Sequence, residues 1–277
     1  MSSSGGRTVV GVMEQVLHYH LVQAQQGLLP STIHASAYKR ILHLNCRTGA
    51  WAIDFSLSYP DVDITGLDSM PHFIEVAQQH TSVGDIRHAH FATHQIDQPL
   101  PFADNTFDLL HFFLFLPVLR PSEWPVVLRD YWRVLRPGGT ISLACLALGA
   151  NSSNAYYRLL QMLEQFFRAQ GYAFSEQAGS LFHGAYLPPL LRRAGFERIV
   201  YTLSPVNFGG WKNGAGRACC QLFLSEIQQN KQAFVGSNLI SDEEFDAVTV
   251  QKLRDTQGAT YYAAGTLLSI AAVKAQG

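Results

Sequence analysis

The fold of this chain is decided by one stretch, ILHLNCRTGAWAIDF, which runs from Ile41 to Phe55. Its apolar start, Ile41 to Leu44, is typical of a strand buried on both faces of a parallel sheet. Asn45 to Gly49 have the composition of a tight turn, and the residues that follow lead into a helix. The stretch therefore predicts a strand, a turn and a helix, the repeating unit of doubly wound sheets.

A second short strand, Val62 to Asp68, ends in an acid. Nucleotide-binding folds place an acid on a ribose about 20 residues after the first turn. Asp68 lies 19 residues past Gly49. We therefore expect Asp68 to hold both ribose hydroxyls of a cofactor. The alternative, a cap at the end of the strand, is less favoured because of the motif that follows.

These features resemble the class I S-adenosylmethionine-dependent methyltransferases, whose first motif is apolar-acid-x-Gly-x-Gly-x-Gly with a strand-ending acid after it. The run Thr48 to Asp54 and the later Pro60, Gly66, Asp68, Ser69 and Pro71 resemble one subgroup of bacterial small-molecule enzymes and fungal regulators of secondary metabolism. The chain departs from the motif at three positions. His43 occupies the position where the family has an acid. Asn45 and Arg47 occupy the positions of the first and second glycines, and of the motif glycines only Gly49 is kept.

A second motif, His94 to Asp108, resembles the family segment in which Gly-Asp-apolar is followed by Leu-Pro-Phe and Phe-Asp. On this alignment Gln95 replaces the acid that receives the adenine amino group, and its carbonyl oxygen can still accept that bond. Ile96 would contact the adenine ring. Arg133 to Gly139 resembles the helix-to-strand turn of the same family.

The resemblance implies that S-adenosyl-L-methionine is the cofactor. The altered turn predicts a site that keeps the adenosine half and binds the methionine half more weakly or differently, with Arg47 near the cofactor carboxylate. Asn45 can keep the turn because it adopts positive φ more readily than most residues. The residues expected to bind cofactor are Tyr19, His43, Asn45, Cys46, Arg47, Gly49, Asp68, Ser69, Met70, Gln95, Ile96 and Phe112.

Alternating strands and helices predict an α/β fold, a doubly wound, seven-stranded, Rossmann-like methyltransferase sheet with helical lid insertions. The seventh strand of the family is an antiparallel partner of the sixth. We expect a helix over Val9 to Gln26 and a fifth strand over Thr140 to Leu148. The expected parts are an N-terminal helical cap (1–40), a cofactor-binding core (41–150), a lid insertion (151–186) and a C-terminal part of the core with a helical insertion (187–277).

The aromatic residues of the insertion indicate an apolar or ring-bearing substrate, although they could equally form the core of a lid. The residues expected to bind substrate are Phe113, Tyr156, Tyr157, His183, Tyr186 and Trp211. Methyl transfer requires alignment of donor and acceptor and can proceed without a base. Candidate bases are His18, His20, Tyr157, His183 and Tyr186. His111, inside an apolar strand, is expected to be a core residue.

Composition excludes several other classes. The net charge of −1 gives no electrostatic support for nucleic-acid binding. The four cysteines have neither metal-site nor disulfide spacing, so we expect free thiols, no metal and a cytoplasmic protein. No signal peptide is recognised, and the most apolar run, Leu109 to Leu119, is too short to span a bilayer. A homodimer is left open.

Three functions remain at this point. The leading one is transfer of a methyl group to oxygen, nitrogen or carbon of a small molecule, in secondary metabolism. The second is a regulatory or binding protein with this fold and no turnover, which the altered turn favours. The third is an enzyme that uses bound cofactor as a fixed charge, or no cofactor, to run a cyclisation or rearrangement.

Overall fold

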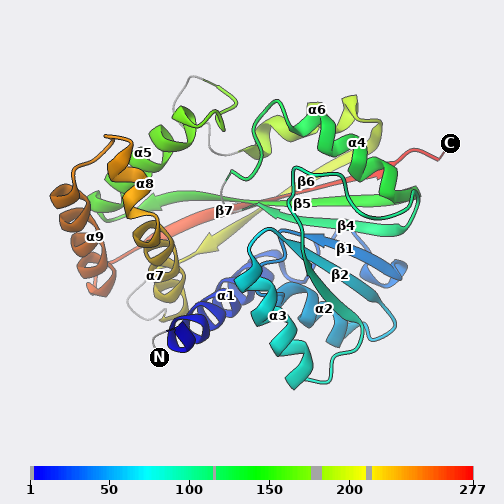
Figure 1. The fold of residues 1–277 in the computed structure, drawn as a ribbon, viewed down its shortest axis with the longest axis horizontal. Coiled ribbons are helices and arrows are strands. Elements are labelled where there is room, and N and C mark those ends of the chain that lie inside the picture. The colour runs from blue at the N-terminus through cyan, green and yellow to red at the C-terminus, as the bar shows by residue number, and fades with distance from the viewer. Residues whose placement is uncertain (1–2, 115–116, 176–182, 210–213, 277) are drawn as a thin grey trace.

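A single seven-stranded sheet crosses the molecule in this computed structural model, which describes residues 3–114, 117–175, 183–209 and 214–276 (Figure 1). The strand order is β3-β2-β1-β4-β5-β7-β6. The first five strands in this order, β3, β2, β1, β4 and β5, are parallel, and β7 is antiparallel to both β5 and β6. The strands are β1 (Arg40–Leu44), β2 (Asp63–Asp68), β3 (Ala89–Thr93), β4 (Phe107–Leu114), β5 (Leu135–Asn151), β6 (Phe196–Asn207) and β7 (Ala263–Lys274). The predicted doubly wound, seven-stranded sheet is confirmed.

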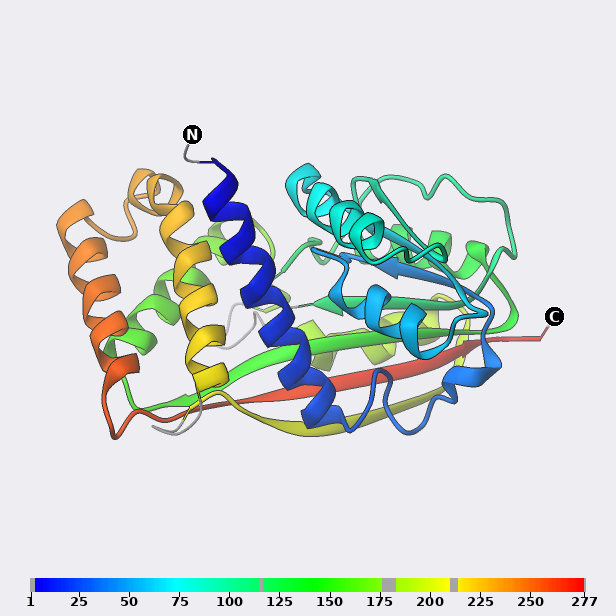
Figure 2. The same ribbon diagram turned by 90° about the horizontal axis from the view of Figure 1, so that it is seen from below.

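Helices cover both faces of the sheet, and a second group gathers at one end (Figures 1 and 2). Helices α4 and α6 lie on one face, and α1, α2 and α3 lie on the other. Figure 2 shows α1 between α7 and the pair α2 and α3. The helices are α1 (Ser3–Gln25), α2 (Ala50–Ser58), α3 (Pro71–Val83), α4 (Trp124–Val134), α5 (Asn154–Ala169), α6 (Leu187–Arg193), α7 (Gly214–Gln229), α8 (Lys231–Gly236) and α9 (Asp242–Gln257), with short 3-10 turns η1 (Ala35–Ala37) and η2 (His183–Tyr186). Among these described helices, none is long and apolar enough to cross a membrane.

Two elements are longer than the sequence predicts. Helix α1 begins at Ser3, six residues before the expected start at Val9. Strand β5 runs from Leu135 to Asn151. It starts early because Leu135 pairs with Phe107 of β4, and it ends late because its antiparallel ladder with β7 continues to the pair Asn151–Ala263. This extension carries the sheet beneath α5 and α7, and α9 packs on those two helices.

The central strands are buried because their side chains alternate between two apolar layers. In β1, Leu42 and Leu44 face the layer that contains α4 and α6, and Ile41 faces the layer that contains α2. All three side chains are at most 1% exposed. At roughly 1.5–3 kcal/mol for each fully buried leucine or isoleucine, this strand is a principal source of stability.

The turn between β1 and α2 has unusual backbone geometry. Asn45, Arg47 and Gly49 have φ values of 54°, 51° and 77°, all in the left-handed region. The positive φ expected of Asn45 is confirmed. A Cβ atom on Gly49 would lie 2.7 Å from the ring of Phe91, so glycine is required at this position by space as well as by φ.

Candidate functional site

A polar cavity of about 300 Å³ lies at the carboxyl ends of β1 and β2. In open parallel sheets this edge is where ligands bind, because the strand order reverses there. We call it the polar cavity. It is lined by Leu44, Asn45, Leu67, Asp68, Ser69, His94, Gln95, Ile96, Asp97, Val118, Arg120, Glu123 and Tyr172.

Asp68 holds the floor of the polar cavity together. Its Oδ2 accepts the main-chain N–H of Arg47 at 2.8 Å, and its Oδ1 accepts that of Met70 at 2.9 Å. The side chain is 3% exposed, and burial raises its pKa, while the two N–H donors and the Arg47 guanidinium act in the opposite direction. A carboxylate has about four acceptor positions, so two remain for hydroxyl groups of a ligand.

Gln95 and Ile96 line the same cavity as Asp68 and Ser69, as the sequence alignment predicts for the two halves of an adenosine site. The segment that contains Gln95 and Ile96 is fixed to the end of β2, because the main-chain N–H of His94 donates to the main-chain carbonyl oxygen of Asp68 at 2.9 Å. These four predicted residues therefore converge on one cavity.

An apolar cavity of about 340 Å³ adjoins the polar one, and we call it the aromatic cavity. Ser69 lines the polar cavity, and its neighbour Met70 lines the aromatic cavity. Tyr172 of the polar cavity also packs edge-on against Phe167 of the aromatic cavity. Helices α3, α5, α7 and α8 supply its walls. The lining residues are Arg47, Met70, His72, Phe73, Leu163, Phe166, Phe167, Phe223, Ile227, Gln229, Asn230 and Phe234.

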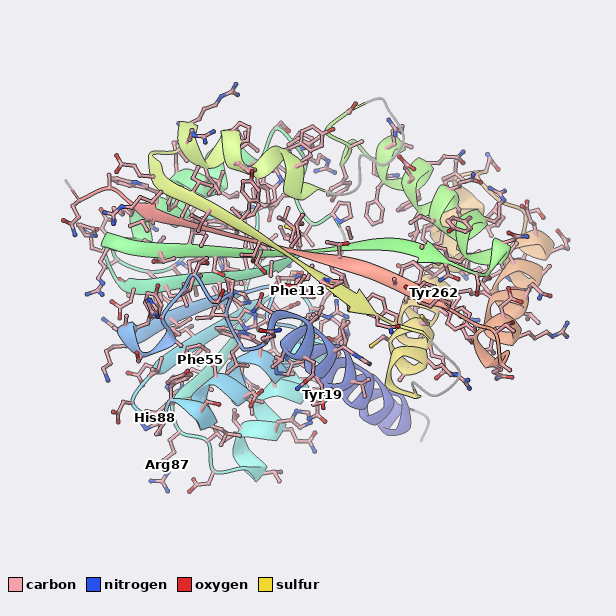
Figure 3. The ribbon with its side chains drawn as sticks, turned by 180° about the vertical axis from the view of Figure 1, so that it is seen from behind. Tyr19, Phe55, Arg87, His88, Phe113 and Tyr262 are labelled. Atoms are coloured by element: carbon pink, nitrogen blue, oxygen red, sulfur yellow. The ribbon has the colours of Figure 1, made fainter. Side chains whose placement is uncertain are left out.

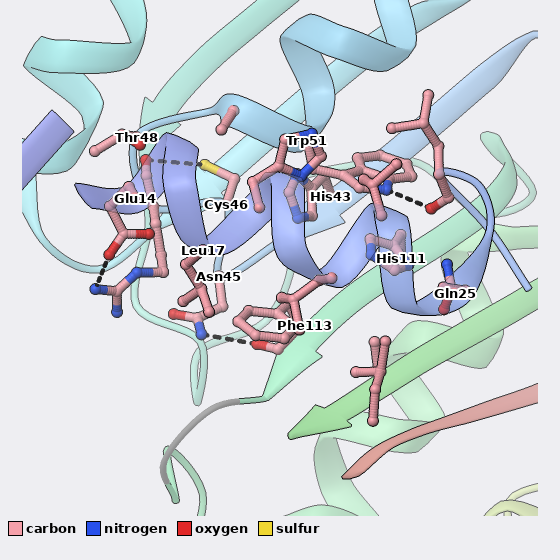
Figure 4. A pocket seen from close by; sticks show the side chains of 18 of the residues that line it. Glu14, Leu17, Gln25, His43, Asn45, Cys46, Thr48, Trp51, His111 and Phe113 are labelled. Atoms are coloured by element: carbon pink, nitrogen blue, oxygen red, sulfur yellow. Dashed lines mark hydrogen bonds and ion pairs between the residues drawn. The ribbon is translucent and has the colours of Figure 1, made fainter. Parts of the chain in front are cut away.

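A third cavity, of about 70 Å³, lies beneath α1 (Figure 4). His43, His111 and Trp51 form one wall, with the Trp51 and His111 rings stacked at 4.2 Å and the two histidine rings 5.2 Å apart. Burial lowers the pKa of His43 well below 6.5 and that of His111 to about 3. Both imidazoles are therefore neutral near pH 7. His111 is a core residue bonded to Ser142, as expected.

Arg47 is the most informative of the altered turn residues. Its guanidinium forms a buried ion pair with Glu14 of α1 and lies 4.6 Å from the ring centroid of Phe73. The two charged side chains are 15% and 6% exposed. Nearby, Asn45 donates from Nδ2 to the oxygen of Phe113 at 2.9 Å, which joins the ends of β1 and β4. Figure 4 shows Glu14 and, near it, Asn45 bonded to Phe113.

Sequence reasoning missed Glu14. A usable signal existed, since it is the single acid in the sequence of α1 and it precedes Leu17, His18 and Leu21 at helical spacing. These residues face the cavity beneath α1 together with Glu14. His72, which lines the aromatic cavity, was missed as well.

Three residues expected to bind the cofactor lie outside the polar cavity. Tyr19 is 58% exposed on the outside of α1 and lines none of these three cavities (Figure 3). Phe112 is fully buried against Trp124 and Tyr131 in the core, because the alternation of β4 turns it toward α4; its neighbour Phe113 lines the cavity beneath α1. Gly49 shapes the turn and lines none of the three cavities.

The expected cofactor residues divide between cavities. His43 and Cys46 line the cavity beneath α1, not the polar cavity, and Met70 lines the aromatic cavity. Cys46 is buried and its main-chain N–H donates to the oxygen of Leu67, which agrees with a packing role.

The substrate and base candidates are scattered. Tyr156 lies in a separate small cavity beside Lys252, and Tyr157 is 43% exposed with its hydroxyl bonded to the N–H of Asn151. Tyr186 stacks on Phe174 at 4.7 Å. None of these three side chains lines the aromatic cavity as the structure describes it.

Two histidines of α1 complete the predicted set. His18 lines the cavity beneath α1 and pairs with Asp54 at 3.1 Å, and burial lowers its pKa. His20 packs edge-on against Phe208. The side chain of His183 and all of Trp211 lie outside the described residues.

Comparison with known proteins gives consistent matches. Residues 41–139 match the family model described as a methyltransferase domain. The ubiquinone/menaquinone biosynthesis C-methyltransferase UbiE of Desulfotalea psychrophila is 31% identical over 179 residues, which cover 58% of this chain and 67% of the relative. The O-methyltransferase rstn1 of Aspergillus nomiae is 30% identical over 168 residues, covering 59% and 67%.

Among solved structures, phosphoethanolamine N-methyltransferase 2 of Haemonchus contortus, in complex with S-adenosyl-L-methionine, aligns with a TM-score of 0.51 at 16% identity. The alignment covers 86% of this chain and 49% of that one. The chain thus spans about half the length of this neighbour, and the likeness is one of fold.

Proposed function

Because the chain belongs to the class I S-adenosylmethionine-dependent methyltransferases, as its motifs predict, we propose that it methylates a small apolar or aromatic molecule. The observation that carries this proposal is the pair of adjoining cavities, one polar at the strand ends and one walled by aromatic side chains. A charged, nucleoside-bearing cofactor suits the first, and a ring-bearing acceptor suits the second.

The residues of the polar cavity fit the adenosine half of the cofactor. Asp68 has acceptor positions for the ribose hydroxyls, Gln95 has a carbonyl for the adenine amino group, and Ile96 has an apolar side chain for the ring face. When bound, S-adenosylmethionine supplies an electrophilic methyl group on a positively charged sulfonium, and S-adenosylhomocysteine is left after its transfer. The chain's part is to align the acceptor with that group and to exclude water.

The acceptor we favour is a planar, hydroxylated ring of the quinol type. Its support is the aromatic lining of Phe73, Phe166 and Phe167, together with the names of relatives that act in quinone biosynthesis. A role in secondary metabolism rests on the subgroup resemblance of the turn. Among the described lining residues, His72 is the imidazole that can accept a hydroxyl proton from such a ring.

The test is methyl incorporation from labelled S-adenosylmethionine into a panel of hydroxylated benzenes and naphthalenes, with aliphatic alcohols of equal size beside them. We expect label in the aromatic set. Gln229→Trp, which narrows the aromatic cavity, should abolish labelling of the aromatic acceptors. Gln228→Trp is the matched control, because Gln228 is the exposed neighbour of Gln229 and does not line the cavity. Label in aliphatic alcohols alone would refute the acceptor class.

One observation favours a second function, a methyltransferase-fold protein that binds ligand without methyl transfer. The side chains of Asn45 and Arg47 fill the turn with a hydrogen bond to Phe113 and an ion pair to Glu14. Binding of S-adenosylhomocysteine with no label in any acceptor would favour this function, or a cyclisation or rearrangement in the same cavity.

A further inference from the structure

The buried ion pair of Arg47 and Glu14 has the two charges needed to hold an α-amino acid. Resting on the function proposed above, we propose that the amino-acid end of the cofactor binds between these side chains, with its carboxylate on Arg47 and its ammonium on Glu14. Helix α1 is then part of the cofactor site through Glu14, 33 positions before Arg47 in the chain.

The turn itself offers no negative charge to an ammonium group. His43 occupies the position of the motif acid, and its ring is 2% exposed between Trp51 and His111. Burial lowers its pKa well below 6.5, so it is neutral near pH 7. Among the described residues that line the cavity beneath α1, Glu14 is the one carboxylate. It is therefore the group that can replace the missing acid.

Charge balance explains why the pair suits a zwitterion. Leaving one member of a buried ion pair without a partner is strongly unfavourable. A ligand carrying both a carboxylate and an ammonium gives each protein charge a new partner when it enters, so neither side chain is left uncompensated. A ligand with only one of these charges would separate the pair and give a new partner to one of its two members alone.

Arg47 is also in the right place along the chain. Its main-chain N–H is bonded to Asp68, the residue proposed to hold the ribose, and its guanidinium is held over Phe73. One residue thus connects the polar cavity with the cavity beneath α1, and a single ligand with a ribose and an amino acid can use both.

The test compares two ligands by titration calorimetry. S-adenosylhomocysteine carries the amino acid, and 5′-methylthioadenosine has the same adenosine and sulfur without it. We expect the unmodified protein to bind S-adenosylhomocysteine at least tenfold more tightly. The double variant Arg47→Met with Glu14→Gln removes both charges of the ion pair together. It should lose this preference, while 5′-methylthioadenosine should bind within about twofold of normal.

The matched control is another arginine–glutamate pair, Arg158 and Glu244, joined at 2.7 Å far along the chain. Arg158→Met with Glu244→Gln should keep the full preference. An unchanged preference in the Arg47 and Glu14 double variant would overturn the inference and leave the proposed function intact. Failure of the unmodified protein to bind either ligand would instead reject the proposed function and the inference with it.

Discussion

The carboxylate of Asp68 accepts the main-chain N–H of Arg47 at 2.8 Å, which ties the end of β2 to the turn after β1. This bond gives Asp68 a role in the fold as well as in the proposed site. Asp68→Ala should therefore lower the free energy of unfolding by roughly 1–3 kcal/mol, because two buried N–H groups lose their acceptor.

The same variant should weaken S-adenosylhomocysteine binding more than tenfold in calorimetry. Urea unfolding measures the stability change, and Asp61→Ala, at an exposed acid paired only loosely with Lys39, is the control. Normal affinity in Asp68→Ala would remove Asp68 from the site.

Gly49→Ala should destabilise the protein by roughly 2–4 kcal/mol. Two effects contribute to this cost. A left-handed φ of 77° costs about 1–2 kcal/mol for a residue with a Cβ atom, and the new Cβ would lie only 2.7 Å from the Phe91 ring. Gly236→Ala is the control, since a Cβ there meets nothing within 4 Å. Equal unfolding midpoints for the two variants would show that the turn relaxes freely.

Stability should rise with pH because of Lys252. Its side chain is 1% exposed, its Nζ donates to the Tyr261 hydroxyl at 2.8 Å, and burial lowers its pKa from 10.5 to about 8. Between pH 8 and 10.5 the unfolded chain binds this proton and the folded chain releases it, so unfolding becomes less favourable as pH increases. The gain is up to about 3 kcal/mol at 1.36 kcal/mol per pKa unit.

Urea unfolding at pH 7.5 and pH 10 tests this, provided that Lys252→Met is measured beside the unmodified chain. The variant should be more stable at pH 7.5 and should lack this part of the pH dependence. A variant less stable than the parent at pH 7.5 would contradict the account of Lys252 as a charge buried at a cost.

His72→Gln should lower kcat for a hydroxylated aromatic acceptor by about 10²-fold, the usual lower range for loss of a general base, with little change in KM for the cofactor. His88→Gln is the control, because that histidine lies on the exposed surface next to Asp63. An unchanged kcat would show that alignment alone drives the transfer.

Helices α1 and α5 should close over bound ligand. Amide hydrogen exchange in both should slow when S-adenosylhomocysteine is added, because lids that exclude water are ordered by ligand. Helix α9, which packs on the far side of α5, should change little. Protection confined to other segments would rule out a lid formed by the cap and the insertion.

The sequence predicts the sheet and which residues meet in the polar cavity, for a physical reason. The carboxyl ends of parallel strands meet at one edge, so Asp68 and the pair Gln95 and Ile96 had to converge once their strands were recognised. Alternation along β4 also requires Phe112 and Phe113 to face opposite layers. Alternation does not say which layer holds the site, and in the structure Phe112 faces the core layer beside Trp124 while Phe113 lines the cavity beneath α1.

The rest of the site depends on packing between distant segments. The partner of Arg47 comes from α1, and the aromatic cavity combines Phe73 of α3 with Phe223 of α7. No local pattern specifies how these helices meet. Tyr156 and Tyr157 show the same limit of local patterns. The helical period shows that their side chains point in different directions, but it does not show which of them faces a ligand.

The central claim is that this methyltransferase binds its cofactor across both the polar cavity and the Arg47–Glu14 pair. The most direct measurement is a crystal structure of the protein grown with S-adenosylhomocysteine. The account predicts density with the ribose on Asp68, the adenine beside Ile96 and the amino acid between Arg47 and Glu14. Density for the ligand elsewhere, with the Arg47–Glu14 pair still closed, would contradict it.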